Sequence, residues 1–185
     1  MRRAGMLIGL TCLCAMAVVS LNARNSYGRQ AMEAPKPGPE MQKLNFLIGA
    51  WDTVSEYEKS TMADGGKQKG WYKAQLGPGG FSVIADFEED STVGKDFGHE
   101  IISWDPKKKA YTVVTLGNAF PGAVIGTAKW EGDDLVILID VENAEAVHLR
   151  AVYVHPQGNV LHIENYIKIG DAPFQLIYKA TATKK

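Results

Sequence analysis

Arg150 and Asn165 are the polar residues of this sequence best placed to bind or orient a ligand. Both lie in stretches of alternating apolar and polar residues, 146–154 and 160–169, which indicates two strands. A two-residue turn at 157–158 would pair these strands so that Arg150 faces Asn165. An arginine among apolar side chains is costly unless an acid neutralises it. We therefore expect Arg150 to meet a buried carboxylate, to pack against a tryptophan at one end of the fold, or to hold an acidic group of a ligand.

The same register predicts which side chains share a face with this pair. Carried through the neighbouring turns, it places mostly apolar residues of 135–141 and 174–181 on that face, which we take as the protein interior. The opposite face carries charged residues, together with Val136, Leu138, Val147, Leu149, Ala151 and Tyr153. That apolar patch indicates either a homodimer interface or an inverted facing. The predicted ligand-binding residues are Arg150, Asn165, His148, Tyr178, Ile137, Val152, Ile163 and Leu176.

Other chemistry finds little support in the sequence. His148, His155 and His162 are spaced seven apart, which puts successive members on opposite faces of strands and makes no metal-binding pair. No nucleophile elbow or phosphate-binding loop occurs, so no catalytic residue and no metal ligand is predicted. A haem would need an inward imidazole, for which His148 is the candidate, or His162 if the register is shifted. The acidic run at 88–90 is expected to be a solvated loop, with a divalent cation as the alternative.

These residues would be positioned by a sheet of about ten strands. Apolar residues recur at helical spacing from Pro39 to Ile48, and Gly49 suits the end of one short helix. From there on the alternation has period two, interrupted by turn signals rich in glycine, aspartate and asparagine. So many strands without intervening helices predict an all-β, closed, antiparallel up-and-down barrel with the helix capping one end. The expected strands are 51–58, 70–76, 81–87, 98–104, 111–116, 123–130, 135–141, 146–154, 160–169 and 174–181.

The N-terminal segment is predicted to be a signal peptide spanning residues 1–23. Arg2 and Arg3 precede an apolar run that is too short for a comfortable membrane span, and cleavage is expected after Ala23, or alternatively nearer residue 17 or 20. Both cysteines lie in this segment, so the mature chain has no thiol, as suits an oxidising compartment. Residues 24–38 are expected to form a flexible linker, and 39–185 the barrel domain. We predict a secreted or periplasmic protein without stable membrane insertion after cleavage.

Charge argues against a nucleic-acid partner. The chain has 20 basic and 21 acidic residues, and losing Arg2 and Arg3 leaves the mature protein with a net charge of −3. The densest basic run, 107–109, follows Asp105-Pro106 in an expected hairpin turn and is not part of a clustered basic face. We therefore expect no nucleic-acid binding.

Four short motifs of the chain resemble a known family. Residues 46–51 (FLIGAW), 79–81 (GGF), 102–106 (ISWDP) and 109–111 (KAY) are similar, in order and spacing, to secreted bacterial lipocalin-like domains of uncharacterised function. The glycine-x-tryptophan at 49–51 also resembles the start of the first strand in calycin barrels, and more distantly that of nitrobindin, a ten-stranded haem-binding barrel. The resemblance implies a calycin barrel whose tryptophan packs across the capped end, and it implies no activity.

The predicted barrel fold and its predicted apolar interior face together indicate a binding protein. We expect a small, mostly apolar or amphipathic ligand inside the barrel, with no cofactor. The alternatives are an isomerase, cyclase or hydrolase that uses the same cavity with Arg150, His148 or Tyr178 as acid, base or anion holder, and a haem-binding protein similar to nitrobindin.

Overall fold

The structure is a computed structural model that describes residues 35–59, 65–91, 94–141 and 146–185. The predicted signal peptide, 1–23, and residues 24–34 of the predicted linker lie outside the described residues. Residues 35–185 form one compact unit. No helix in the described ranges is both long enough and apolar enough to cross a bilayer.

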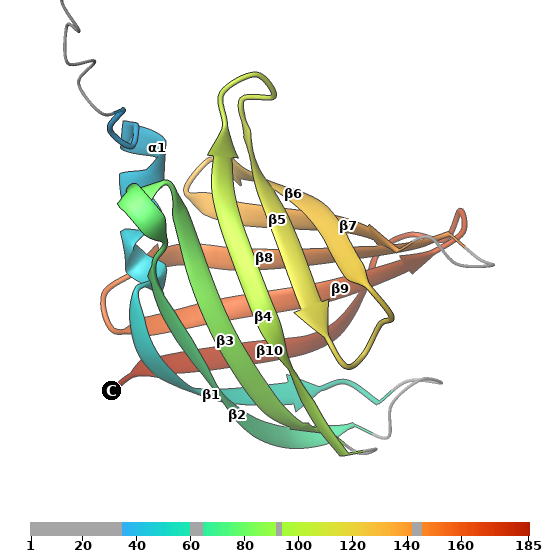
Figure 1. Ribbon diagram of the computed structural model, residues 1–185. Helices are drawn as coiled ribbons and strands as arrows, with labels where there is room; N and C mark the ends of the chain where they lie inside the picture. Colours follow the sequence, from blue (N-terminus) through green and yellow to red (C-terminus); the bar gives the residue numbers. More distant parts are fainter. Residues whose placement is uncertain (1–34, 60–64, 92–93, 142–145) are drawn as a thin grey trace, which may run out of the picture. The chain divides into compact units, whose positions relative to one another are not determined.

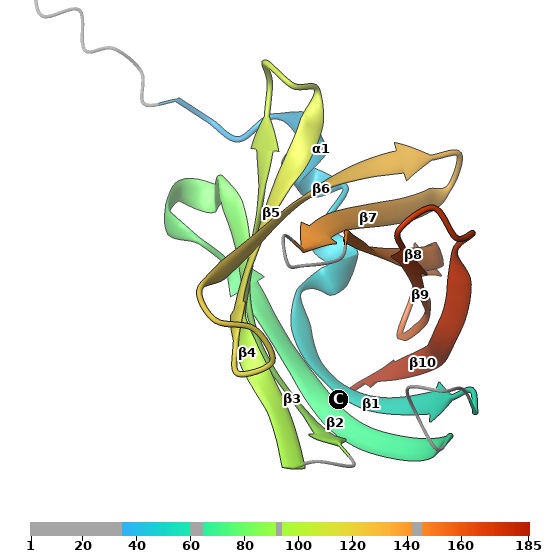
Figure 2. The ribbon, with the colours of Figure 1, turned by 90° about the vertical axis from the view of Figure 1, so that its right-hand side faces the viewer.

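Ten antiparallel strands in the described part of the chain form a closed barrel, as the alternation predicted (Figures 1 and 2). Each strand pairs with its neighbours in sequence, and the first strand pairs with the last, so the topology is up-and-down. Every predicted strand has its counterpart. In chain order the elements are α1 (Pro39–Gln42), η1 (Asn45–Leu47), β1 (Gly49–Tyr57), β2 (Gly66–Leu76), η2 (Pro78–Gly80), β3 (Ser82–Ser91), β4 (Gly94–Asp105), β5 (Ala110–Gly117), β6 (Ala123–Glu131), β7 (Asp134–Val141), β8 (Val147–Gln157), β9 (Val160–Ile169) and β10 (Gln175–Lys184).

The short helical segment closes the end of the barrel at which β1 begins (Figure 1). Met41, Leu44 and Leu47 are buried in the main core cluster together with residues of β2 to β7. The indole nitrogen of Trp51 donates a hydrogen bond of 2.9 Å to the carbonyl oxygen of Leu47. Trp51 is 1 % exposed, so the first strand and the helical segment are joined by a buried polar contact within an apolar layer. We call this end of the barrel the capped end.

Gly49 makes the sharp passage from helix to strand possible. Its φ of 133° lies in the region that L side chains rarely adopt, and a Cβ there would stand 2.7 Å from the Cε of Lys184. The backbone conformation therefore favours glycine, whereas the flexible end of the Lys184 side chain could move away from a Cβ. Trp51 follows two residues later because that position faces the interior.

The facing predicted for β8 is wrong. Val154 lies opposite His162, not Leu161, because the pairing shifts by one residue between Val154 and Gln157, where His155 has a φ of 40°. Such a bulge adds one residue to one strand, and a one-residue shift turns every side chain to the other face. The interior face of β8 accordingly carries Leu149, Ala151 and Tyr153, whereas His148, Arg150 and Val152 lie on the outer face.

The inward position predicted for Leu176 is also wrong, because β10 contains a second bulge. The register of β10 against β9 shifts between Leu176 and Tyr178. Tyr178 lies opposite Asn165 on the interior face, as predicted, but Leu176 lies opposite Tyr166, which shares the outer face with Arg150. The facing predicted for β7 is confirmed, since Ile137 and Ile139 point inward.

Candidate functional site

The barrel encloses a cavity of about 340 Å³, which we call the interior cavity. Its wall is formed mostly by apolar and aromatic side chains from all ten strands. At the capped end it is bounded by Leu47 and Trp51. Further lining residues are Thr53, Ser55, Tyr72, Phe87, Glu89, Asp96, Glu100, Thr115, Val124, Ile137, Ile139, Leu149, Ala151, Tyr153, Leu161, Ile163, Asn165, Tyr178, Ala180 and Ala182.

Half of the residues predicted to bind a ligand line this cavity. Ile137, Ile163, Asn165 and Tyr178 do so, and they come from β7, β9 and β10. Four others belong to the outer face, as the two bulges dictate: His148, Arg150, Val152 and Leu176. The expected pairing of Arg150 with Asn165 is therefore wrong, because Arg150 lies opposite Tyr166.

Arg150 is held by outer-face partners. Its guanidinium lies 3.6 Å from Glu131 Oε2 and 5.6 Å from the ring centroid of Tyr166. The Tyr166 hydroxyl donates to Glu164 at 2.5 Å, and Lys179 donates to the same carboxylate at 2.8 Å. The two hydrogen bonds to Glu164 lower the pKa of its carboxyl group. Arg150 thus meets an acid on the outside of the barrel, and because Glu131 is 58 % exposed, this is not the buried carboxylate that was expected.

A carboxyl group lies inside the cavity toward its capped end. The Tyr72 hydroxyl donates to Glu100 Oε1 at 3.4 Å, and Tyr153 is close enough to Glu100 to have its own pKa raised by that charge. Burial raises the pKa of Glu100 to about 7, and the hydrogen bond from Tyr72 opposes that rise only in part. Glu100 is deep in the barrel and keeps accessible surface because that surface faces the cavity.

A second acidic group lies toward the opposite end of the cavity. Glu89 is near the end of β3, and Asp96 near the start of β4 pairs with it across the hairpin. The Tyr57 hydroxyl donates to Glu89 Oε2 at 3.3 Å. Burial is the largest cause that raises the pKa of Glu89, and hydrogen bonds from Ser55 and Tyr57 counteract it. Burial also raises the pKa of Asp96.

Two stacked tyrosines lie beside Glu89, and one of them, Tyr178, lines the cavity. The rings of Tyr57 and Tyr178 have centroids 4.5 Å apart and an interplanar angle of 30°. Burial raises the pKa of both phenols, and the neighbouring Glu89 adds to the effect. Both hydroxyls therefore stay protonated at neutral pH and can donate hydrogen bonds to a ligand or to a carboxylate.

The sequence interpretation missed both interior glutamates. It treated 88–90 as a solvated loop, but these residues are in β3, where Glu89 has the same facing as Ala85 and Phe87. Glu100 also faces the cavity, whereas its neighbour His99 pairs with Asp86 outside, at 2.5 Å. Strict alternation from Ile102 back through Glu100 was the available signal. Among the described residues, no group of three or more histidine, cysteine and acidic side chains could hold a metal ion.

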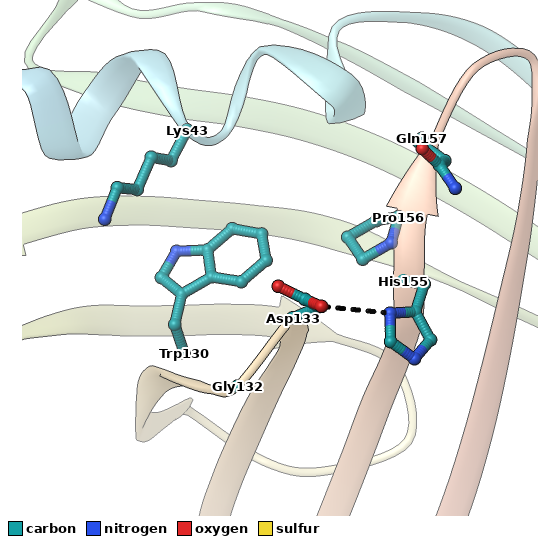
Figure 3. A pocket seen from close by; sticks show the side chains of 7 residues that line it. All are labelled: Lys43, Trp130, Gly132, Asp133, His155, Pro156 and Gln157. Atoms are coloured by element: carbon teal, nitrogen blue, oxygen red, sulfur yellow. Dashed lines mark ion pairs between the residues drawn. The ribbon is translucent and has the colours of Figure 1, made fainter.

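A different pocket, of about 570 Å³, lies near Lys43 and Trp130 (Figure 3). Figure 3 shows Asp133 directed at His155, whose Nδ1 lies 3.7 Å from Asp133 Oδ2. Lys43, Asp133, His155 and Gln157 are all exposed, so water competes for every contact this pocket could offer. We therefore take the smaller interior cavity as the candidate site.

The alternative functions depend on residues that the cavity does not contain. None of the four histidines of the chain lines it, so the residues present do not fit a histidine-ligated haem there. For an enzyme, Tyr178 remains inside, whereas Arg150 and His148 face outward. His148 instead places its Nδ1 2.6 Å from Asp140.

Comparison with known proteins supports the barrel fold and assigns no function. No family model and no curated protein matches the chain. Among solved structures, the crystal structure of Rv2717c from M. tuberculosis is similar, with a TM-score of 0.56 and 15% sequence identity over 81% of this chain and 99% of that one. At this identity the likeness supports a shared barrel fold alone.

Proposed function

We propose that the protein binds a small, largely apolar molecule in the interior cavity. One observation carries the proposal: a closed barrel surrounds a cavity of about 340 Å³ whose wall is mainly apolar and aromatic. Well-packed interiors leave few voids larger than a water molecule, so a space of this size is unlike ordinary core packing. Apolar enclosure supplies affinity, and a few polar groups set orientation.

The proposal extends to the kind of protein and its location. A lipocalin-like, calycin-type barrel fits the strand order, the capping helix and the tryptophan at its first strand. The predicted signal peptide would place the mature protein in the periplasm or outside the cell, where such a barrel would carry or sequester its ligand.

Native mass spectrometry tests the proposal directly. The purified mature protein is offered a panel of fatty acids, fatty alcohols, alkyl amines, isoprenoids and tetrapyrroles, and we expect one or more to bind with one molecule per barrel. Ala151 lines the cavity, so Ala151→Phe fills part of it and should weaken binding at least tenfold. Leu138→Phe is the matched control, because Leu138 is 42 % exposed on the outer face of the adjacent strand.

Two outcomes would contradict the proposal. Absence of any bound member of the panel is the first. Equal binding by wild type and a folded Ala151→Phe variant is the second, because the ligand would then lie outside the interior cavity.

A further inference from the structure

We propose that the ligand of the interior cavity is an amphipathic amine whose ammonium group pairs with Glu89 and whose apolar body extends toward Trp51 and Leu47. This inference rests on the proposed function and names the chemical class of its ligand. Four observations support it: the acidic charges on the cavity wall, the unpartnered Oε1 of Glu89, the tyrosine pair beside Glu89, and the pairing of Lys95 with other acids.

The charges on the cavity wall are of one sign. Glu89, Asp96 and Glu100 line the cavity, and of the described residues that line it none is a lysine, arginine or histidine. Carboxyl groups in an enclosed apolar space are costly when ionised and unpaired. The cavity therefore offers acceptors for a cation that the wall itself does not supply.

Glu89 has an oxygen that no described group satisfies. Its Oε2 accepts a hydrogen bond from the Tyr57 hydroxyl at 3.3 Å, and the nearby Ser55 hydroxyl also lowers the pKa of this carboxyl group. Its Oε1, however, is buried and has no hydrogen-bond partner within the described ranges. A buried acceptor without a donor costs about 1–3 kcal/mol, and more when it is charged. An ammonium group brings three donors and a positive charge, and it would satisfy this oxygen.

The side chains around Glu89 suit a cation. From β1 and β10 the stacked pair of Tyr57 and Tyr178 lies beside it, and the Tyr57 hydroxyl donates to Glu89, so the oxygens of both hydroxyls are also available to accept a hydrogen bond from an ammonium group. From β4 Asp96 adds a second acid, and Asp90 on β3 itself adds a third whose charge reaches Glu89. Each of these groups would strengthen the binding of a cation and weaken the binding of an anion.

Lys95, at the start of β4 in the same hairpin, pairs with acids other than Glu89. Lys95 pairs with Glu88, and its Nζ lies 3.3 Å from Asp90 Oδ1 on the outer side of the β3–β4 hairpin. Glu88 also borders the cavity, but Glu88 and Asp90 both pair with Lys95, whereas Glu89 between them faces the cavity without a cation. The protein thus neutralises the outer carboxylates of this hairpin and leaves the inner one without a cation.

The experiment compares octylamine, octanol and octanoic acid, which share one apolar body and differ in head group. Binding to the mature protein at pH 7 is measured by isothermal titration calorimetry and by intrinsic tryptophan fluorescence, to which Trp51 and Trp71 in the cavity wall contribute. We expect octylamine to bind at least tenfold tighter than octanol, and octanoic acid to bind most weakly. Glu89→Gln should abolish the preference for the amine. Asp86→Asn removes the same charge further along the outer face of β3, where Asp86 pairs with His99, and should keep it.

A second measurement follows the affinity for octylamine against pH. The affinity should fall as pH drops through the pKa of Glu89, which burial raises, because Glu89 takes up a proton while the amine stays cationic. The same titration is run on Glu100→Gln, because Glu100 lines the same cavity with a pKa of about 7 and its protonation must be told apart from that of Glu89. Conversely, adding octylamine should lower the pKa of Glu89, which can be measured from the pH dependence of its carboxyl carbon NMR signal.

The outcomes separate this inference from the proposed function. If octanol or octanoic acid binds as tightly as octylamine, or if the affinity for the amine does not depend on pH, the amine assignment is overturned and the binding function stands. If none of the three compounds and no member of the larger panel binds, both are overturned.

Discussion

Glu100 shows how one buried carboxyl group can make the whole fold sensitive to pH. Its pKa of about 7 in the folded protein lies above the ordinary 4.5, because burial disfavours the charged form. The folded state therefore holds this proton more tightly than the unfolded state between these two values. The sign follows: the contribution of Glu100 to the free energy of unfolding falls as pH rises from about 4.5 to about 7 and stays low above that.

Replacing Glu100 by glutamine should remove this pH dependence. We expect Glu100→Gln to raise the free energy of unfolding by about 2 kcal/mol at pH 8.5 and to leave it nearly unchanged at pH 4, since one pKa unit corresponds to about 1.4 kcal/mol and water in the cavity reduces the full effect. Urea denaturation at the two pH values measures the difference. Glu56→Gln, on the exposed face of β1, is the control and should show no such pH-dependent gain. An equal effect of Glu100→Gln at both pH values would contradict the assignment.

Arg150 illustrates why single residues are hard to place from sequence. It was expected in the interior against a buried carboxylate, a tryptophan or a ligand, but it lies on the outer face, where the exposed Glu131 is its acidic partner. The same reasoning overlooked Glu89 and Glu100, which face the interior within strands whose outward neighbours are also charged. Alternation predicts that neighbours differ in facing, but composition alone does not show which of two adjacent charged residues points inward.

Turns and strands were predictable because their signals are local. Gly132 and Gly158, with φ of 64° and 73°, begin the two-residue turns of the β6–β7 and β8–β9 hairpins, and glycine is the natural residue there. The second of these turns lies at 158–159, one residue later than the predicted 157–158. The bulge in β8 was not foreseen, although Pro156 was a signal: proline cannot donate to a ladder and within sheets is confined to edges, strand starts and bulges. The bulge at Leu176 and Tyr178 has no such marker in the sequence.

The positive φ of His155 in the β8 bulge leads to a prediction about substitutions at this position. Its φ of 40° is unfavourable for any residue with a Cβ and most of all for a β-branched one. His155→Val should therefore be less stable than His155→Gly by about 1–2 kcal/mol, because only glycine relieves the backbone. Both variants lose the same exposed ion pairs with Asp133 and Asp134, so the comparison isolates the backbone effect.

Chemical denaturation of the two variants measures this difference. His162→Val serves as the control, because His162 is exposed in the extended strand β9, where a β-branched residue is tolerated well. If valine and glycine at position 155 give the same unfolding midpoint, the positive φ does not hold in solution.

At the scale of the whole barrel, closure joins the two ends of the chain. β1 pairs with β10 from Trp51 opposite Lys184 to Tyr57 opposite Tyr178. Trp51, Leu161 and Ala182 form a buried cluster across the strands on both sides of this junction. Closure leaves no open edge among the described strands, so the backbone groups of β1 and β10 are satisfied by each other.

Two truncations should therefore differ in their effect on folding, because only one of them removes a strand. A chain that starts at Pro35 retains every strand and the whole described core, and we expect its thermal and urea unfolding to match those of the mature protein. A chain that also ends at Phe174 lacks β10, exposes the edges of β1 and β9 and opens the buried cluster around Trp51. Such edges pair with other molecules, so we expect aggregation and no cooperative transition. Size-exclusion chromatography and circular dichroism distinguish the cases. A monomeric, cooperatively folded chain without β10 would show that closure is not what stabilises this barrel, and its cavity would then have to be held open by the remaining nine strands alone.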